Sequence, residues 1–375
     1  MDQADKFIQK IKTQLRKLPT ASIITQLRRG VRRKRSTLVL VFLGFIVLKL
    51  FLGRSHIVTL QGEVMHIPYH IQYLDQWGRN YQEEIDALLK QLHHALSADL
   101  PDSELSRFNK HDCSDFYFES PFFYPVFAKS KEIYRNTAGA FNPTISPLDN
   151  LREVQPVDAN DADRLPANTT YECVSLDYIV ANAQRIKKLR EGVKLDFRSI
   201  LRGYSVDKIA DLLRTHGIEC MQIVLGSVTL VCGQPSKRGA WPIAIPSYAT
   251  SLVDNKLQID MKLVNKAVAI AQQEGQRVPH HNSTMGAYTD YLAQPTLLAA
   301  VVVGEDCRTV DAYATAMMAR GLTFAQELLV QQKEIAAFLI YEDDHGVPAF
   351  YTSPGLHMQK DKRSITLQSA EEEVS

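Results

Sequence analysis

The sequence predicts an α+β domain that follows one N-terminal transmembrane helix. Residues 36–53 are almost entirely apolar. The residues after them mix strand-like and helix-like segments without the regular βαβ alternation of a doubly wound sheet. With 45% hydrophobic and 23% charged residues among 375, the chain has the composition of a globular protein with a sizeable core.

The stretch STLVLVFLGFIVLKLFLG, residues 36–53, is long enough to cross about 30 Å of hydrocarbon as a helix. Its charge, Lys49, lies near the far end, where a long side chain reaches the interface. A buried core helix is the alternative, but a basic run precedes the stretch and positive residues favour the cytoplasmic side. A cleavable signal peptide fits less well, because no small-residue cleavage site follows Gly53. We therefore expect residues 1–35 to form a basic cytoplasmic segment and the following domain to lie outside the cytoplasm.

The charge of the whole chain argues against nucleic acid as a partner. Lys and Arg number 43 against 42 Asp and Glu, a net charge of +1. The five cysteines show no CxxC pair and no zinc-like spacing, so no thiol chemistry is indicated. In an oxidising compartment Cys113 and Cys173 could pair, which the sequence leaves open.

The first half of the outer domain begins with residues 56–75, whose alternation of apolar and polar residues is typical of a half-buried strand. Residues 80–99 have helical spacing of apolar residues, and residues 100–110 indicate a loop. Residues 125–141 form a second helix that ends in a glycine turn at Gly139. Strands are expected at 176–189 and 192–197.

The second half continues with a helix that Gly217 closes. Strands are then expected within 220–234, 240–247, 256–272, 297–305, 334–343 and 347–353. The strand at 297–305 is apolar enough to be buried on both faces. Residues 309–332 predict two helical segments broken at Gly321. We place the domain at 55–350 and a C-terminal tail at 351–375.

Three short stretches carry candidate chemistry. GAFNPTISPLDNL joins a glycine turn to Asn142 and Pro143, and LDFRSILRGYSVD places Asp196 before a helix. TVDAYATAMMARG places Asp311 and Thr315 four residues apart, on one helix face where a carboxylate and a hydroxyl can meet one cation. Each stretch alone is weak, because Asp-x-x-x-Thr is common and an acid at a helix start often only complements the helix dipole.

Taken in order with DSELSRFN and VLGSV, these stretches resemble the ApbE family, flavin transferases that move FMN from FAD onto proteins. The resemblance covers roughly residues 55–345 and implies an ApbE-like mixed sheet and helix domain. It implies that Mg²⁺ bridges the pyrophosphate of FAD, the substrate, while a Thr or Ser hydroxyl of an acceptor protein attacks the FMN phosphorus and AMP leaves. Family members generally work outside the cytoplasm, commonly as lipoproteins, so the span would anchor a periplasmic domain in a bacterial inner membrane.

The resemblance also assigns roles to residues of this chain. Asp311 and Thr315 match the metal-binding and catalytic pair, and the Ser199 carbonyl falls where it would complete the metal site. The positions that match cofactor contacts are Met65, Ala140, Phe141, Asn142, Asp196 and Arg202. Asn142 replaces the family's usual acid with an amide.

The chain departs from the family pattern at several points. Met65-His66-Ile67 stands for Met-Gly-Thr, Asp99 for a ring-stacking Tyr, and Gly226-Ser227-Val228 for Gly-Gly-Asp. HHNSTMG, with His280 and His281, replaces a His-x-x-Asp-Pro-x-Thr-Gly segment, and AIAQQ replaces Thr-Ser-Gly. Arg198 enters the turn before the helix, where it could either hold a pyrophosphate or block it.

These departures leave more than one function open. One is a membrane-anchored FAD:protein FMN transferase that acts on an acceptor flavoprotein subunit of a membrane electron-transfer complex. The other is a catalytically impaired flavin- or partner-binding protein that helps another redox enzyme to mature. A structural anchor without a ligand is a third interpretation. The Asp311–Thr315 pair favours the transferase, because a scaffold has no need of a hard-cation site.

Overall fold

The computed structural model describes residues 56–144, 173–235, 239–245, 258–272, 297–360 and 364–369. The chain divides into two units, Met1–Ser55 and His56–Ser375, and every described residue belongs to the second. Within this described part, no helix is long and apolar enough to span a bilayer. The predicted span at 36–53 lies outside the described residues.

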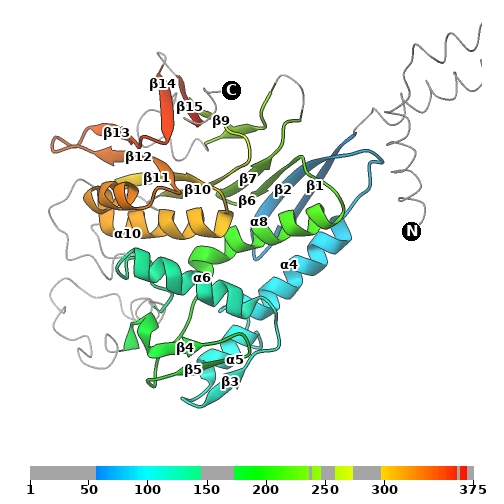
Figure 1. The fold of residues 1–375 in the computed structure, drawn as a ribbon, viewed down its shortest axis with the longest axis vertical. Helices are drawn as coiled ribbons and strands as arrows, with labels where there is room; N and C mark the ends of the chain where they lie inside the picture. The colour runs from blue at the N-terminus through cyan, green and yellow to red at the C-terminus, as the bar shows by residue number, and fades with distance from the viewer. Residues whose placement is uncertain are drawn as a thin grey trace, which may run out of the picture. The chain divides into compact units, whose positions relative to one another are not determined.

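An eight-stranded sheet forms the middle layer of the domain (Figure 1). In spatial order its strands are β1 (His56–Val64), β2 (Ile67–Asp75), β6 (Met221–Leu225), β7 (Val228–Cys232), β10 (Lys266–Gln272), β11 (Leu297–Gly304), β12 (Ala336–Glu342) and β13 (Pro348–Thr352). Every neighbouring pair is antiparallel. An antiparallel sheet with helices on one face is an α+β arrangement, so the α+β part of the predicted fold class is confirmed.

Helices cover one face of this sheet. Here α8 (Arg198–Thr215) packs on β6 and β7, while α10 (Cys307–Gln331) packs on β10 and β11. Two further helices, α4 (Gln82–Leu96) and α6 (Phe123–Asn136), pack in turn against α8. The largest hydrophobic core lies between the helices and the sheet. The predicted break in α10 is confirmed, because Gly321 has φ 78° and ψ −170°.

A smaller four-stranded sheet packs on the other face. Its order is β14 (Leu356–Lys360), β15 (Ser364–Ser369), β9 (Gln258–Lys262) and β8 (Pro242–Ala244). A second core lies between the two sheets, with Trp241, Met261 and Leu367 facing Val301 and Phe338. All eight residues of β11 are buried because this strand is covered on both faces, which confirms the prediction of a fully buried strand.

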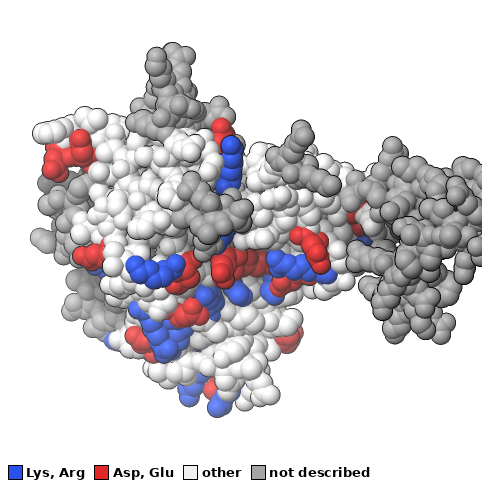
Figure 2. Space-filling model, turned by 45° about the horizontal axis from the view of Figure 1, so that its top comes forward, with Lys and Arg blue, Asp and Glu red and all other residues white. Residues whose placement is uncertain are grey.

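A third, three-stranded sheet contains β3 (Asp115–Tyr117), β5 (Arg185–Lys188) and β4 (Ile179–Ala181). A single 3₁₀ turn, η3 (Leu176–Tyr178), leads into β4. A short helix, α5 (Glu104–Lys110), precedes β3. On the face drawn in Figure 2, acidic and basic side chains lie side by side, so charges of opposite sign balance locally there.

The structure corrects four details of the sequence prediction. Residues 56–75 form two strands, not one, and residues 100–110 contain α5, whose N-cap Ser103 accepts a hydrogen bond from the Ser106 N–H at 2.9 Å. Residues 192–197 form no strand, because their backbone groups pair with side chains and loops instead. The chain after residue 350 continues into β14 and β15 rather than a tail.

The cysteines form no disulfide, and all five lie in the part of the chain that the structure describes. The pairing of Cys113 and Cys173 that the sequence left open is therefore absent here. Cys232 and Cys307 are buried, whereas Cys113, Cys173 and Cys220 are partly buried.

The turn between β1 and β2 explains why the sequence suggested one long strand. Met65 and His66 both have positive φ, 52° and 58°, as the two central residues of a tight hairpin turn of this hand require. Asn or Gly normally marks such a turn, and neither occurs here. The register pairs Val64 with Ile67, so apolar strand residues flank the two turn residues directly and no glycine or asparagine separates the strands in the sequence.

We predict that His66→Gly stabilises the protein by roughly 0.5–1 kcal/mol. A residue with a Cβ is strained in this left-handed conformation, and glycine is not. The free energy of this strain exceeds the cost of the greater conformational entropy that glycine has in the unfolded chain. His66 is fully exposed, and its contact with Glu63 at 3.5 Å contributes little at the surface. Urea unfolding measures the effect. His70→Gly, in the middle of β2, is the control and should destabilise; a loss of stability in both variants would contradict the prediction.

Candidate functional site

The site is built on a backbone contact between α8 and α10. A Cβ added to Gly203 of α8 would lie 2.2 Å from the carbonyl oxygen of Cys307 in α10. No side chain fits that space, so only glycine lets the two helices approach this closely. Asp311 lies one turn after Cys307 on α10, and this contact therefore brings its side chain against α8.

Asp311 is held by α8 through both of its carboxylate oxygens. Its Oδ1 accepts a hydrogen bond from Arg202 Nη2 at 3.1 Å, and its Oδ2 accepts one from the Gly203 N–H at 3.1 Å. The carboxylate is almost completely buried. Burial raises the pKa of Asp311 above its ordinary value, while the Arg202 guanidinium and the Gly203 N–H oppose that rise.

Ser199 and Thr315 lie at the same helix crossing. Gly203 follows Ser199 by four residues, so the N–H that contacts Asp311 is the one that a regular helix directs at the Ser199 carbonyl. The Thr315 hydroxyl donates to the Asp311 carbonyl at 3.0 Å and keeps its oxygen lone pairs. The structure therefore joins Arg202 and Asp311 through their side chains. Of the other residues that the sequence assigned to this site, Thr315 lies one turn after Asp311 on α10 and Ser199 lies one turn before Gly203 on α8.

Asp196 and Arg198, the first residue of α8, form a local ion pair at the start of that helix. Asp196 Oδ1 accepts from the Arg198 backbone N–H at 2.9 Å, and Oδ2 lies 2.7 Å from Nε and 2.6 Å from Nη2. Asp196 is buried and Arg198 is half exposed. The Arg198 guanidinium is therefore held against the Asp196 carboxylate, and the two charges neutralise each other.

The segment 140–144 contacts the same turn. The Pro143 carbonyl accepts a hydrogen bond from the Asp196 N–H at 2.8 Å. Asn142 Oδ1 accepts from the Thr144 N–H at 3.0 Å and from its hydroxyl at 2.6 Å, an arrangement that an acid or an amide can supply equally. Ala140 is buried and Phe141 lies fully buried in the main core. The three residues predicted to contact cofactor therefore shape the loop beside Asp196.

Asn109, the last residue of DSELSRFN, fixes the chain just before Asp196. Its Nδ2 donates to the Leu195 carbonyl and its Oδ1 accepts from the Leu195 N–H, both at 2.7 Å. The buried Lys188 donates to the carbonyls of Asn109 at 3.0 Å and His111 at 2.9 Å, at the end of α5. Burial lowers the pKa of Lys188. Three separate motifs of the sequence thus meet at the start of α8.

Met65 belongs to a second group of residues, where two hairpin turns touch. The Gly226 N–H donates to the Pro68 carbonyl at 3.1 Å, and a Cβ on Gly226 would lie 2.9 Å from Ile67 Cγ2. Gly226 and Ser227 connect β6 to β7, so the diverged Met65-His66-Ile67 and Gly226-Ser227 segments are neighbours. Residues 280–286, including His280 and His281, lie outside the described residues.

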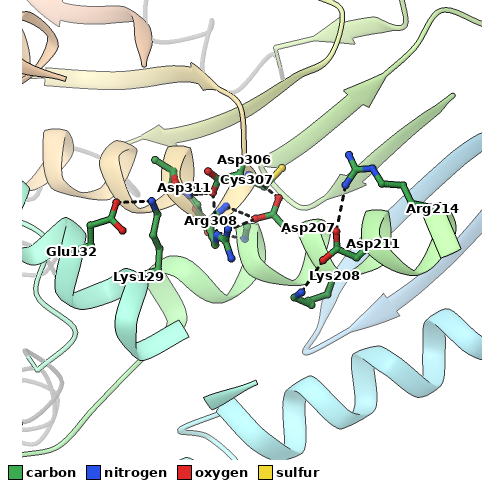
Figure 3. A network of polar contacts seen from close by, with 12 residues as sticks. Lys129, Glu132, Asp207, Lys208, Asp211, Arg214, Asp306, Cys307, Arg308 and Asp311 are labelled. Carbon is green, nitrogen blue, oxygen red and sulfur yellow. Dashed lines mark hydrogen bonds and ion pairs between the residues drawn. The ribbon is translucent and has the colours of Figure 1, made fainter. Parts of the chain in front are cut away.

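The sequence missed Asp207, which attaches α8 to the N-terminus of α10 (Figure 3). Its carboxylate accepts from the backbone N–H groups of Cys307 at 2.8 Å and Arg308 at 3.1 Å. The N-cap Asp306 accepts from the Thr309 N–H at 3.0 Å. Burial raises the pKa of Asp207 to about 6, although the two N–H groups oppose the rise. The signal in the sequence was an acid four residues after Gly203, on the face of α8 that Gly203 marks as buried.

The donor atoms at the helix crossing suit a magnesium ion whose remaining ligands are oxygen atoms of a substrate. A carboxylate, a hydroxyl and a backbone carbonyl are the hard oxygen ligands that Mg²⁺ prefers. Within the described ranges, no group of three or more His, Cys, Asp or Glu side chains could hold a metal ion. Mg²⁺ is usually bound by one or two carboxylates together with phosphate oxygens, so a single-carboxylate set of this kind fits it.

We predict that Gly203→Ala destabilises the protein by about 3 kcal/mol, because α8 and α10 must separate to admit the methyl group. Urea unfolding and the thermal midpoint measure the effect. Gly217→Ala is the matched control: its Cβ meets nothing within 4 Å, so only the positive φ of 78° costs stability, about 1 kcal/mol. Equal losses in the two variants would rule out a close-packed crossing.

The pH dependence of stability should reveal Asp207. Its pKa in the folded protein, about 6, exceeds the ordinary value of 3.8, so the folded state binds the proton more tightly. This contribution is fully present below pH 4 and is lost as the pH rises through 6, and it amounts to about 3 kcal/mol. The free energy of unfolding of the wild type minus that of Asp207→Asn should therefore be larger at pH 4 than at pH 7. Asp211→Asn, an exposed acid of α8, should show no such difference; a pH-independent difference for Asp207→Asn would contradict the assignment.

Comparison with known proteins places this geometry in a family. The ApbE family profile matches residues 65–339. The FAD:protein FMN transferase of Vibrio cholerae is 26% identical over 311 residues, covering 79% of this chain and 91% of that protein. The enzyme of the same name from Haemophilus influenzae is 27% identical over 313 residues, covering 78% and 88%.

Solved structures agree with this match. The flavin transferase ApbE from Vibrio cholerae superposes with a TM-score of 0.67 at 25% identity, covering 80% of this chain and 98% of that one. The apo flavinyl transferase ApbE of Pseudomonas stutzeri, 22% identical, has the same fold with a TM-score of 0.65. Because the family profile extends over well more than half of the sequence, the chain belongs to the ApbE family.

Proposed function

We propose that this protein is a membrane-anchored FAD:protein FMN transferase that depends on Mg²⁺. The observation that carries the proposal is the buried Asp311 carboxylate at the α8–α10 crossing, which contacts Arg202 and the Gly203 N–H and lies one helical turn before Thr315. Relatives named FAD:protein FMN transferase match along most of their own length. The shared part is therefore nearly the whole of those proteins rather than a fragment.

The proposed reaction moves the FMN half of FAD to an acceptor protein. The hydroxyl oxygen of a Thr or Ser attacks the phosphorus of the FMN phosphate, and the bond from that phosphorus to the bridging oxygen breaks. The hydroxyl loses its proton, and AMP leaves with the bridging oxygen. Positioning and charge stabilisation supply most of the catalysis in transfers of this kind.

The residues at the crossing have distinct roles in this proposal. Asp311, the Thr315 hydroxyl and the Ser199 carbonyl would hold Mg²⁺, which when bound offsets negative charge on the pyrophosphate oxygens. Arg202 brings a second positive charge to the same place. Gly203 and Asp207 fix the distance between the helices, and Asn109 fixes the backbone before Asp196. Rigid helices carry the site, which limits the loss of orientation.

The membrane anchor and the acceptor are also part of the proposal. Support for the anchor is the apolar stretch at 36–53, which follows a run of basic residues at 28–35 and precedes the lone Arg54. This orientation places residues 1–35 in the cytoplasm and the domain on the periplasmic side of a bacterial inner membrane. An acceptor on that side would be a flavoprotein subunit of a membrane electron-transfer complex.

One specific arrangement favours the second candidate, a flavin- or partner-binding protein without transferase activity. Asp196 is paired with Arg198, and Asp311 is paired with Arg202, so both predicted acids are already neutralised. Asp99 also cannot stack on a flavin ring as the family's Tyr does. A protein of this kind would keep the fold and bind FAD without releasing AMP.

One experiment separates the two functions. The full-length chain, purified in mild detergent, is incubated with FAD, Mg²⁺ and an acceptor protein that presents a threonine. Transfer yields AMP and adds the mass of one FMN to the acceptor by mass spectrometry. Retention of intact FAD without AMP would exclude the transferase and support the binding protein.

We predict that Asp311→Ala lowers AMP release by at least about 100-fold, because the proposed metal site loses the buried carboxylate that would hold Mg²⁺. Chromatographic measurement of AMP gives the rate. Asp344→Ala, an exposed acid in the turn between β12 and β13, is the control and should leave the rate unchanged. Unchanged turnover in folded Asp311→Ala would remove Asp311 from the active site.

A further inference from the structure

The ion pair between Arg202 and Asp311 is incomplete. A guanidinium usually meets a carboxylate through two parallel N–H···O bonds. Here one Nη2···Oδ1 contact at 3.1 Å joins the two side chains. Arg202 Nε is buried, and it has no hydrogen-bond partner within the described part of the chain. The pair therefore lacks the second bond that would make it a permanent structural contact.

The two partners also differ in how freely they can move. The Asp311 side chain is 3% exposed and is fixed by the Gly203 N–H, whereas the Arg202 side chain is 33% exposed. Moving the Asp311 side chain would break its hydrogen bond to the Gly203 N–H, at a crossing where the helix backbones are in contact. Moving Arg202 requires only a change of rotamer toward solvent. If the pair opens, Arg202 is the residue that leaves.

We propose that the Arg202 guanidinium acts as an internal cation beside Asp311 and competes with the divalent metal for the Asp311 carboxylate. This inference rests on the proposed function, in which Asp311 holds Mg²⁺. A guanidinium at 3.1 Å and a divalent cation repel each other, so the metal binds Asp311 well only after Arg202 has moved away. Before a metal binds, Arg202 thereby keeps the site neutral, and the buried carboxylate has a partner in both arrangements.

The competition has a thermodynamic consequence for the substrate. An anionic pyrophosphate near the crossing attracts the guanidinium that leaves Asp311, so it favours the metal-bound arrangement. The metal and the nucleotide then strengthen each other's binding, and by linkage the factor is the same in both directions. Without the arginine, the metal binds tightly whether or not nucleotide is present.

The test compares Mn²⁺ binding, followed by the electron paramagnetic resonance signal of free Mn²⁺, in full-length wild type, Arg202→Met and Arg198→Met without nucleotide. Arg202→Met should bind Mn²⁺ about tenfold more tightly than the wild type. Arg198→Met removes the same charge from a neighbouring exposed residue and should change the dissociation constant less than about twofold. Equal or weaker binding by Arg202→Met, or tightening of the same size in Arg198→Met, would overturn the proposal.

A second variant guards against misfolding. Arg202→Gln keeps a hydrogen-bond donor for Asp311 but carries no charge, and it should tighten Mn²⁺ binding in the same direction. Asp311→Asn should abolish the tight binding of Arg202→Met; if it does not, the metal lies elsewhere and the proposal fails.

The assay of AMP release is separate from the metal titration. If Arg202→Met binds Mn²⁺ more tightly but the wild type releases no AMP, the competition between Arg202 and the metal is supported and the transferase function is rejected. Rapid AMP release by the wild type, together with unchanged Mn²⁺ binding by Arg202→Met, would support the transferase and reject the competition between Arg202 and the metal.

Discussion

The backbone contact between Gly203 and Cys307 is the constraint on which the rest of the site depends. Because no Cβ separates α8 from α10, the two helices approach closely enough for Asp311 to accept a hydrogen bond from the backbone of α8. Asp207 secures the same crossing from the other side by accepting N–H groups at the start of α10. A carboxylate on each helix thus pairs with the backbone of the other, so the position of Asp311 is set by main-chain geometry and not by flexible side chains.

Charge compensation is the second principle of the site. Asp196 has Arg198, Asp311 has Arg202, and Asp207 has the N-terminus of α10. A buried carboxylate without such a partner would be costly, and its proton would be held to higher pH. The Arg198 guanidinium, which by sequence could have bound a ligand or excluded it, is directed at Asp196 by two short contacts. Its first effect is therefore to neutralise a buried acid.

The sequence predicted best where one segment contains its own signal. Gly321 breaks α10, and the apolar run of β11 marks a strand covered on both faces. The prediction failed where the signal lies in contacts between distant residues. Met65 and His66 form a turn that neither residue type favours, because the flanking strands impose it. Asp207 looked like one more acid on a helix, since its partners lie 100 residues further along the chain. The motifs could be recognised from their order in the sequence. The hydrogen bonds by which Asn109 and Pro143 connect them could be seen only in the folded structure.

The departures from the family pattern are unevenly placed, and this bears on function. His66 and Ser227 lie on the touching turns at the ends of the β1–β2 and β6–β7 hairpins. At the helix crossing, in contrast, the buried Asp311 carboxylate accepts the Gly203 N–H, and the Thr315 hydroxyl donates to the Asp311 backbone carbonyl. A chain that had lost all metal chemistry would gain stability by replacing Asp311 with an apolar residue, because a buried ion pair is rarely better than good packing. A buried Asp311 paired with the partly exposed Arg202 instead fits a site in which the carboxylate can exchange the arginine for a metal ion.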